Sequence, residues 1–130
     1  MRHREEARRQ LLEAARRYAR RLSDRVPVQW VVVAGSVARG DFHDGSDIDV
    51  LVVSDALPPH PLRRAELLFE VAEGSVEPKG LTLDELQREL ARGNPLVVEA
   101  LSRGVVVHPE GATLVGLRHR LSQRPRAQSS

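Results

Sequence analysis

The stretch AGSVARGDFHDGSDIDVLVV, residues 34–53, decides the fold of this chain. It places a glycine–serine pair at the end of one apolar run and an Asp-x-Asp pair at the beginning of the next. Short apolar runs bounded by proline, glycine and polar residues are typical of buried strands. We therefore predict strands over residues 27–34 and 47–55, joined by a loop over residues 36–46 that contains a single helical turn. The second strand is apolar on both faces beyond Asp49, which indicates a central position in its sheet.

Asp47 and Asp49 occupy alternate positions of the second predicted strand. Side chains two residues apart point to the same face of a sheet, so both carboxylates project together. Two carboxylates this close repel each other unless a cation lies between them, and carboxylate oxygens suit Mg²⁺ or Mn²⁺. An Asp-x-Asp pair by itself is common, and two solvent-facing acids at the start of a strand remain the alternative.

The glycine–serine pair, Gly35-Ser36, ends the first predicted strand. Glycine lets the backbone approach a ligand closely, and amides at the start of a helical turn point toward an anion. The Ser36 hydroxyl can donate one more hydrogen bond to a phosphate oxygen, and Arg39 lies one turn further on. The alternative for this pair by itself is an ordinary turn in which Ser36 is only a cap.

Together the two features favour one chemistry. A phosphate cradle ends one strand, and a carboxylate pair opens the strand expected beside it, with Asp47 eleven positions after Ser36. A triphosphate held by the cradle would then meet metal ions held by the aspartates. This arrangement is typical of metal-assisted phosphoryl or nucleotidyl transfer, in which two ions about 3.5–4 Å apart span the attacking and leaving oxygens.

The rest of the chain alternates helical and extended patterns without an internal repeat or a domain boundary. We expect a single domain over residues 1–130 with a frayed tail at 124–130. Pro78 places the third strand at an edge or on a bulge. Thr82 and Glu85 form the pattern of a capping box, and Asn94-Pro95 begins a helix. The predicted helices cover residues 5–22, 61–72, 83–91, 95–103 and 111–122, and the further strands cover 75–81 and 105–108.

The composition excludes several classes of protein. With 130 residues, 41% of them hydrophobic and 29% charged, the chain fits one globular domain with a modest core. The lack of cysteine excludes a disulfide scaffold, thiolate zinc sites and thiol catalysis, and it fits a reducing cytoplasm. No apolar run approaches the roughly 20 residues of a membrane span, and the N-terminus lacks the apolar stretch of a signal peptide. We therefore expect a cytoplasmic protein with no membrane partner.

The formal net charge of +2 conceals a segregation of charge along the chain. Residues 1–25 hold nine arginines against four acidic residues, and residues 111–130 hold four arginines and no acid. Residues 26–110 hold seven basic and fourteen acidic residues. The basic ends suit an anionic partner or are solvated helix faces, and nucleic-acid binding stays open. An aromatic content of 3% argues against a surface that stacks bases, which makes direct nucleic-acid recognition the weakest hypothesis.

Gly35-Ser36, Arg39-Gly40 and Ser46-Asp47-Ile48-Asp49 resemble the signature of the DNA polymerase β-like nucleotidyltransferase superfamily. The similarity is closest to its minimal nucleotidyltransferase (MNT) group, and a Gly-Ser followed by Asp-x-Asp at this spacing is much more specific than either half. The resemblance implies an α+β fold, a small mixed sheet of about four strands flanked by helices. It also implies a nucleoside triphosphate as donor and two divalent ions, Mg²⁺ or Mn²⁺.

The superfamily also implies a third carboxylate on a later strand, and Glu77 is the candidate here. Many members carry aspartate at that position, so the glutamate is a departure. Its longer side chain would complete the metal site or act as base for the incoming hydroxyl. Lys79 would share the face of Glu77 and contact phosphate, whereas solvent-facing positions are the alternative for both residues.

The resemblance implies an activity and a partner. We expect transfer of a nucleoside monophosphate, AMP from ATP, to a hydroxyl on a partner macromolecule, because so short a chain has no separate acceptor domain. MNT proteins commonly pair with a small helical HEPN protein, as antitoxin to a toxin that they modify or mask. The alternative is a non-catalytic module that keeps the fold and masks its HEPN-type partner. The base preference, the acceptor and the oligomeric state are not determined by the sequence.

Overall fold

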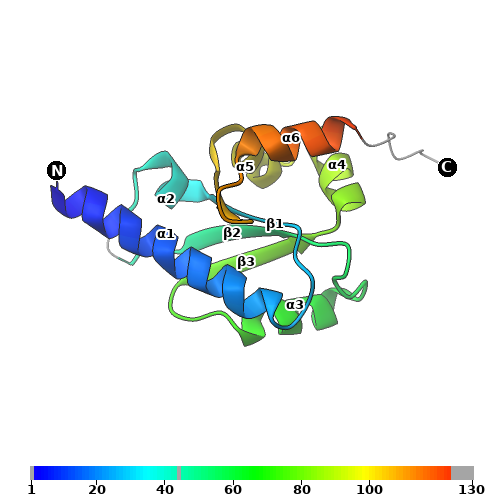
Figure 1. The fold of residues 1–130 in the computed structure, drawn as a ribbon, viewed down its shortest axis with the longest axis horizontal. Coiled ribbons are helices and arrows are strands. Elements are labelled where there is room, and N and C mark those ends of the chain that lie inside the picture. Colours follow the sequence, from blue (N-terminus) through cyan, green and yellow to red (C-terminus); the bar gives the residue numbers. More distant parts are fainter. Residues whose placement is uncertain (1, 44, 124–130) are drawn as a thin grey trace.

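One four-stranded sheet forms the centre of the protein (Figure 1). The computed structural model describes residues 2–43 and 45–123. The strands are β1 (Trp30–Ala34), β2 (Ile48–Val53), β3 (Val76–Leu81) and β4 (Val105–His108). Their order in the sheet is β3-β2-β1-β4, with β1 antiparallel to β2 and β4, and β2 parallel to β3. The mixed sheet that the resemblance implies is present, with β2 inside the sheet and β3 at an edge as predicted.

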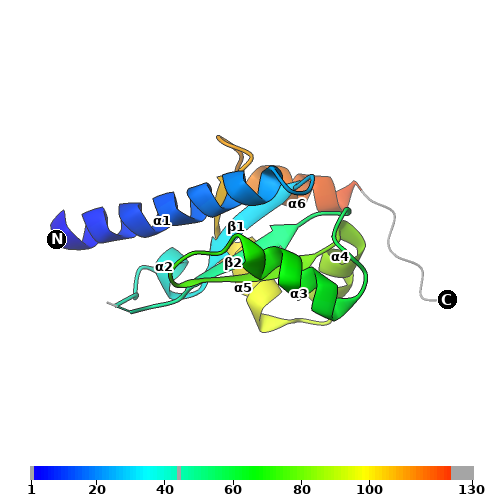
Figure 2. The same cartoon turned by 90° about the horizontal axis from the view of Figure 1, so that it is seen from below.

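Helices cover both faces of this sheet. They are α1 (Arg2–Ser23), α2 (Gly35–Arg39), α3 (Pro61–Glu70), α4 (Leu83–Ala91), α5 (Pro95–Arg103) and α6 (Leu114–Ser122). The helices α1 and α3 lie on one face, and α4, α5 and α6 lie on the other (Figures 1 and 2). Each face of the sheet therefore has its own apolar core.

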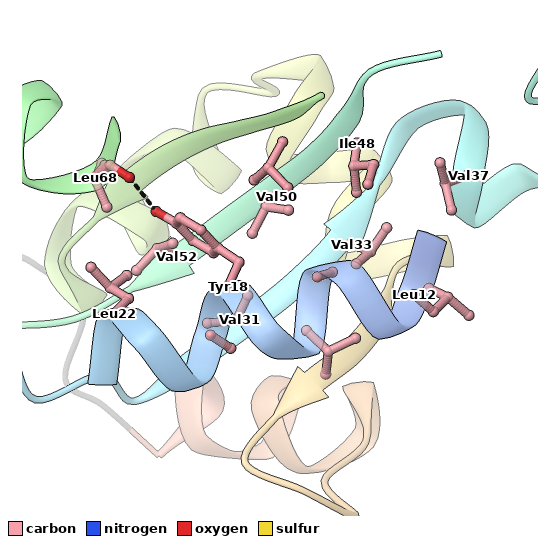
Figure 3. Packing of buried hydrophobic residues seen from close by; sticks show 14 of the residues in the cluster. Leu12, Tyr18, Leu22, Val31, Val33, Val37, Ile48, Val50, Val52 and Leu68 are labelled. Atoms are coloured by element: carbon pink, nitrogen blue, oxygen red, sulfur yellow. Dashed lines mark hydrogen bonds between the residues drawn. The ribbon is translucent and has the colours of Figure 1, made fainter. Parts of the chain in front are cut away.

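The two cores follow from the alternation of side chains along the strands. Val50 and Val52 pack against α1 and α3, whereas Leu51 and Val53 pack against α4, α5 and α6. Tyr18 of α1 is fully buried, and its hydroxyl donates a hydrogen bond of 2.8 Å to the carbonyl oxygen of Leu68 in α3 (Figure 3). An apolar run that is buried on both faces accounts for the central place of β2.

The predicted starts of α3, α4 and α5 are confirmed, whereas α1 begins at Arg2 instead of residue 5 and α6 begins at Leu114 instead of residue 111. Pro61 is the first residue of α3, Thr82 and Glu85 form the capping box of α4, and the side chain of Asn94 caps α5. None of the helices within the described ranges is long and apolar enough to cross a membrane. A single domain over residues 1–130 stays a prediction, and the tail that we expected to fray, residues 124–130, lies outside the described residues.

The first strand is shorter than predicted. We expected it to begin at residue 27, but β1 begins at Trp30. Before it, the Gln29 amide still donates to the Val53 carbonyl, but the carbonyl of Pro27 accepts from the Ser54 side chain and that of Val28 contacts the His108 ring. Asp47 likewise lies one residue before the start of β2.

Candidate active site

The chain turns sharply at Gly35, where β1 passes into α2. Gly35 has a φ of +68°, in the left-handed region that favours glycine. A Cβ atom added to Gly35 would overlap with Oδ2 of Asp49, which pairs with Ala34 in the β1–β2 register. Glycine is therefore required at this position for two reasons: the backbone conformation and the space that Asp49 occupies. Its presence lets the Asp49 carboxylate lie directly against the backbone of the glycine–serine turn.

A hollow of about 520 Å³ opens at this turn, a size typical of small-ligand sites. It contains five residues that the sequence singled out as a phosphate cradle and a carboxylate pair. The lining residues are Gly35, Ser36, Arg39, His43, Gly45, Ser46, Asp47, Asp49, Pro95, Leu96 and Glu99. The structure thus brings together the two halves of the predicted site, and α5 supplies a wall that the sequence did not predict.

The electrostatics of the hollow centre on Asp49, which is half-buried. Burial raises the pKa of its carboxyl, and the negative charges of Asp47 and Glu99 raise this pKa further, while Arg39 opposes them. Each of these causes except the arginine disfavours a negative charge at Asp49. A cation bound between Asp47 and Asp49 would relieve the repulsion, so the site is suited electrostatically to a metal ion.

Glu77 lies beside the aspartate pair in the sheet. It is in direct register with Asp49 on the parallel neighbour strand β3, so the two side chains share one face of the sheet. Neighbouring strands lie about 4.8 Å apart, which puts Glu77 within reach of the same ligand. Its side chain is exposed, and it is not among the residues that line the hollow of Gly35.

Lys79 lies on the same face of β3 as Glu77, as predicted, but it does not line the hollow of Ser36. It is exposed and lines a second hollow at the β3 edge, together with Arg64 and Phe69 of α3. It pairs in register with Leu51, two residues further along β3 than Glu77. The structure therefore brings Glu77 alongside the aspartates but places Lys79 in a hollow separate from that of Ser36.

The donor atoms fit a divalent ion that also binds phosphate. Within residues 2–43 and 45–123, no three His, Cys, Asp or Glu side chains are arranged to hold a metal by themselves. Mg²⁺ usually binds through one or two carboxylates and completes its shell with water and substrate phosphates. Asp47 and Asp49 supply such a carboxylate pair, and the turn at Ser36 faces the same hollow.

Glu99 of α5 is a site residue that the sequence analysis missed. One of its oxygens accepts hydrogen bonds from the Gly35 amide at 2.9 Å and from Nη1 of Arg39 at 2.7 Å. Nε of Arg39 donates to Asp41 at 3.2 Å. The arginine and the amide that we expected to bind phosphate are thus held by a carboxylate. The available signal was weak: Glu99 is the single charged residue in the segment 95–102.

A model of the nucleotidyltransferase domain family matches residues 15–109 of the chain. The chain belongs to this family. The matched range contains the glycine–serine turn, both aspartates, Glu77 and Glu99 of this nucleotidyltransferase domain. The resemblance to the minimal nucleotidyltransferases of the polymerase β-like superfamily is confirmed, and so is the assignment of the chain to the nucleotidyltransferase enzymes.

A solved structure supports the fold. The domain is similar to a crystal structure described as a "putative nucleotidyltransferase" from Sulfolobus solfataricus, with a TM-score of 0.60 and 24% sequence identity. The alignment covers 79% of this chain and 84% of that one. A comparison with curated proteins gave no significant match. The predicted α+β architecture of a mixed sheet flanked by helices is confirmed.

Proposed function

We propose that this nucleotidyltransferase moves AMP from ATP to a hydroxyl group of a partner macromolecule and releases pyrophosphate. The observation that carries the proposal is the contact between the two motifs: the carboxylate of Asp49 lies against the backbone of Gly35, in one hollow with Ser36. A bound triphosphate could therefore touch the turn and a metal ion at the aspartates at once. Pro95 and Leu96 of α5 give the same hollow an apolar rim.

The residues of the turn would bind the phosphates. The Ser36 hydroxyl and the neighbouring amides donate hydrogen bonds to the β- and γ-phosphate oxygens and stabilise the charge of the leaving pyrophosphate. Arg39 lines the same hollow but is held by Glu99 and Asp41. A phosphate that replaces one of these carboxylates would receive a charge-assisted hydrogen bond from the guanidinium group.

Asp47, Asp49 and Glu77 would hold the divalent ions, Mg²⁺ or Mn²⁺. When bound, these ions neutralise charge on the triphosphate and lower the pKa of the acceptor hydroxyl. Glu77 lies in register with Asp49 and is exposed, so its carboxylate can move toward a ligand without unpacking the core. The acceptor hydroxyl gives its proton to Glu77 or to water, and its oxygen attacks the α-phosphorus in line as the bond from the α-phosphorus to the pyrophosphate oxygen breaks.

The acceptor would be supplied by a partner, and a HEPN-type helical protein is our candidate from the family resemblance. The pair would act as toxin and antitoxin, with this chain as antitoxin. A non-catalytic module that masks the same partner is the second candidate, because the fold alone could present a binding surface. A cytoplasmic location stays a prediction from the absence of cysteine.

Calorimetry with ATP and Mg²⁺ tests the nucleotide site. We expect the wild-type protein to bind Mg·ATP and the Asp47→Asn variant to lose that binding, because an amide is a poor ligand for a hard cation. Asp24→Asn is the matched control, since Asp24 is exposed in the turn after α1. Unchanged binding by Asp47→Asn would reject the metal assignment.

Transfer of label from ATP tests the reaction itself. Incubation with α-labelled ATP and a helical protein encoded beside this chain should move the label onto that protein, and Asp49→Asn should abolish the transfer. If the partner binds without transfer, and Asp49→Asn preserves the biological effect, the masking module is the correct function.

A further inference from the structure

The first turns of α1 contribute little to the core of the domain, where Ala7 and Leu11 pack partly against it. These turns extend past the sheet and lie beside α2, as both views show (Figures 1 and 2). Residues 3–6 are exposed, and the first buried side chain of the helix is Leu12. Two arginines of this projecting segment, Arg4 and Arg8, form hydrogen bonds with the loop beside it.

Arg8 and Arg4 donate hydrogen bonds to four backbone carbonyls of the segment that follows Ser36. Arg8 donates from Nε to Val37 at 3.1 Å and from Nη2 to Ala38 at 3.3 Å. Arg4 donates from Nη2 to Gly40 and to Phe42, both at 2.7 Å. The last carbonyls of a helix have no partner within the helix, so guanidinium groups satisfy the C-terminal end of α2 and the loop after it.

Arg4 is also anchored by an aromatic ring. Its Cζ atom lies 4.5 Å from the centroid of Phe42, a distance typical of a cation–π contact. Phe42 is itself buried in the core beneath α1 and α2. The ring therefore fixes where Arg4 can lie, and Arg4 in turn holds both ends of the short segment from Gly40 to Phe42.

The helix that these arginines hold carries the predicted phosphate-binding groups. With five residues, α2 is too short to be stable by its own hydrogen bonds. At its other end Glu99 accepts from the amide of Gly35. Between these two attachments lie Ser36 and Arg39, so contacts outside α2 decide where both side chains point.

We propose that Arg4 and Arg8 are positioning residues of the nucleotide site, a role that rests on the proposed function. They touch no substrate; they fix α2 so that Ser36 and Arg39 face the hollow. A planar guanidinium group spans two carbonyls with a geometry that a lysine ammonium cannot reproduce. A displacement of about 1 Å in a catalytic group can cost on the order of a hundredfold in rate.

This role differs from the one that the charge of the N-terminal segment suggested. An anionic partner or a solvated face requires guanidinium groups that point into solvent. Arg9 meets that description, because it is exposed and bonds to Glu6 on its own helix. Arg4 and Arg8, by contrast, direct their donors at the backbone of the loop.

The test compares Arg4→Ala, Arg8→Ala and Arg8→Lys with the control Arg9→Ala. We expect either alanine variant to weaken Mg·ATP binding or to slow transfer by about tenfold to a hundredfold, whereas Arg9→Ala stays within about twofold of the wild type. Arg8→Lys should recover only part of the lost binding or transfer, since lysine keeps the positive charge but lacks the planar guanidinium group that spans two carbonyls. Amide hydrogen exchange gives a readout that is independent of activity: residues 37–43 should exchange faster in the alanine variants, with β1 and β2 unchanged.

Two results would overturn the inference while leaving the proposed function intact. The first is wild-type binding and transfer in the alanine variants, with unchanged exchange over residues 37–43. The second is an Arg8→Lys variant that equals the wild type, since charge alone would then suffice. A wild-type protein that binds no Mg·ATP would instead overturn the proposed function, and the positioning role with it.

Discussion

Gly35 determines both the course of the backbone after β1 and the position of the Asp49 carboxylate. Its positive φ turns the chain out of β1, and its lack of a side chain makes room for Oδ2 of Asp49. Any other residue would be strained in its backbone and would also push the carboxylate away from the turn. The Gly-Ser pair and the Asp-x-Asp pair are thus one structural unit, although eleven positions separate Ser36 from Asp47 in the sequence.

Gly35→Ala tests this unit. We expect it to lower the free energy of unfolding by about 2–3 kcal/mol, since strained φ and a steric overlap combine, and to abolish metal binding. Gly74→Ala is the matched control: its φ of +61° is similar, but a Cβ there meets nothing within 4 Å. It should cost about 1 kcal/mol and leave metal binding unchanged. Urea unfolding and calorimetry measure both effects, and equal losses in the two variants would contradict the overlap.

Glu99 contributes, after burial and the charge of Asp47, to the raised pKa of Asp49. The negative charge of Glu99 raises the Asp49 pKa, and the Arg39 guanidinium that Glu99 holds lowers it. Glu99→Gln removes the negative charge that raises the Asp49 pKa, and it weakens the ion pair that holds Arg39 away from Asp49. Both changes lower the Asp49 pKa. Because protons compete with the metal for this carboxylate, metal binding should persist to a lower pH in the variant than in the wild type.

A carboxyl-carbon NMR titration would measure this shift directly, with metal binding followed over the same range of pH. Glu89→Gln is a suitable control, since Glu89 of α4 pairs with Arg92 just after the helix and lies outside the hollow. An Asp49 pKa that rises in Glu99→Gln, or does not move, would contradict the electrostatic role of Glu99.

At the scale of helices and strands, the sequence was most informative for features that depend on residues close together in the chain. Buried strands appear as short apolar runs, and the caps at Thr82 and Asn94 need residues only two or three positions apart. The start of β1 was misplaced because Pro27 and Val28 bond to side chains that are distant in the sequence. Strand ends depend on such tertiary partners, which apolar patterning does not reveal.

The capping box of α4 makes the stability of the domain depend on pH. Burial raises the pKa of Glu85, but hydrogen bonds from the Thr82 amide and from Arg64 outweigh it, so the folded-state pKa lies below the ordinary value of 4.5. The unfolded chain therefore binds the proton more readily than the folded one. The contribution of Glu85 is fully present above pH 4.5 and is lost as the pH falls through the folded-state pKa.

Urea unfolding at several values of pH tests this dependence. The wild type should lose more stability than Glu85→Gln as the pH falls below about 4.5, because the variant has no carboxylate to protonate. Glu66→Gln, at an exposed position of α3, should follow the wild type. Thr82→Ala removes the other half of the box and should cost about 1 kcal/mol. Parallel curves for the wild type and Glu85→Gln would contradict the assignment.

At the scale of the whole molecule, the site is assembled from segments that lie far apart in the chain. The turn and the aspartates are close in the sequence and could be predicted from it. The bond from Gly35 to Glu99 spans 64 residues, and those from Arg8 to the turn span 29 and 30. The local pattern of α1 does not mark Arg8 as part of the site, and that of α5 marks Glu99 only weakly, because their partners are groups that only the folded chain brings near.

The predicted metal-binding carboxylates and the buried Tyr18 hydrogen bond lie on opposite faces of the sheet. Asp49 and Glu77 lie on the face of Leu51, whereas Tyr18 joins α1 to α3 on the opposite face. Tyr18→Phe removes the buried hydrogen bond to Leu68 and should lower the free energy of unfolding by about 1 kcal/mol. Because the phenylalanine ring still fills the core, α1 stays in place and Mg·ATP binding should stay within about twofold of the wild type. Arg8→Ala should instead lose little free energy of unfolding and most of its Mg·ATP binding. A Tyr18→Phe variant that lost Mg·ATP binding would contradict this separation of the Tyr18 hydrogen bond from the nucleotide site.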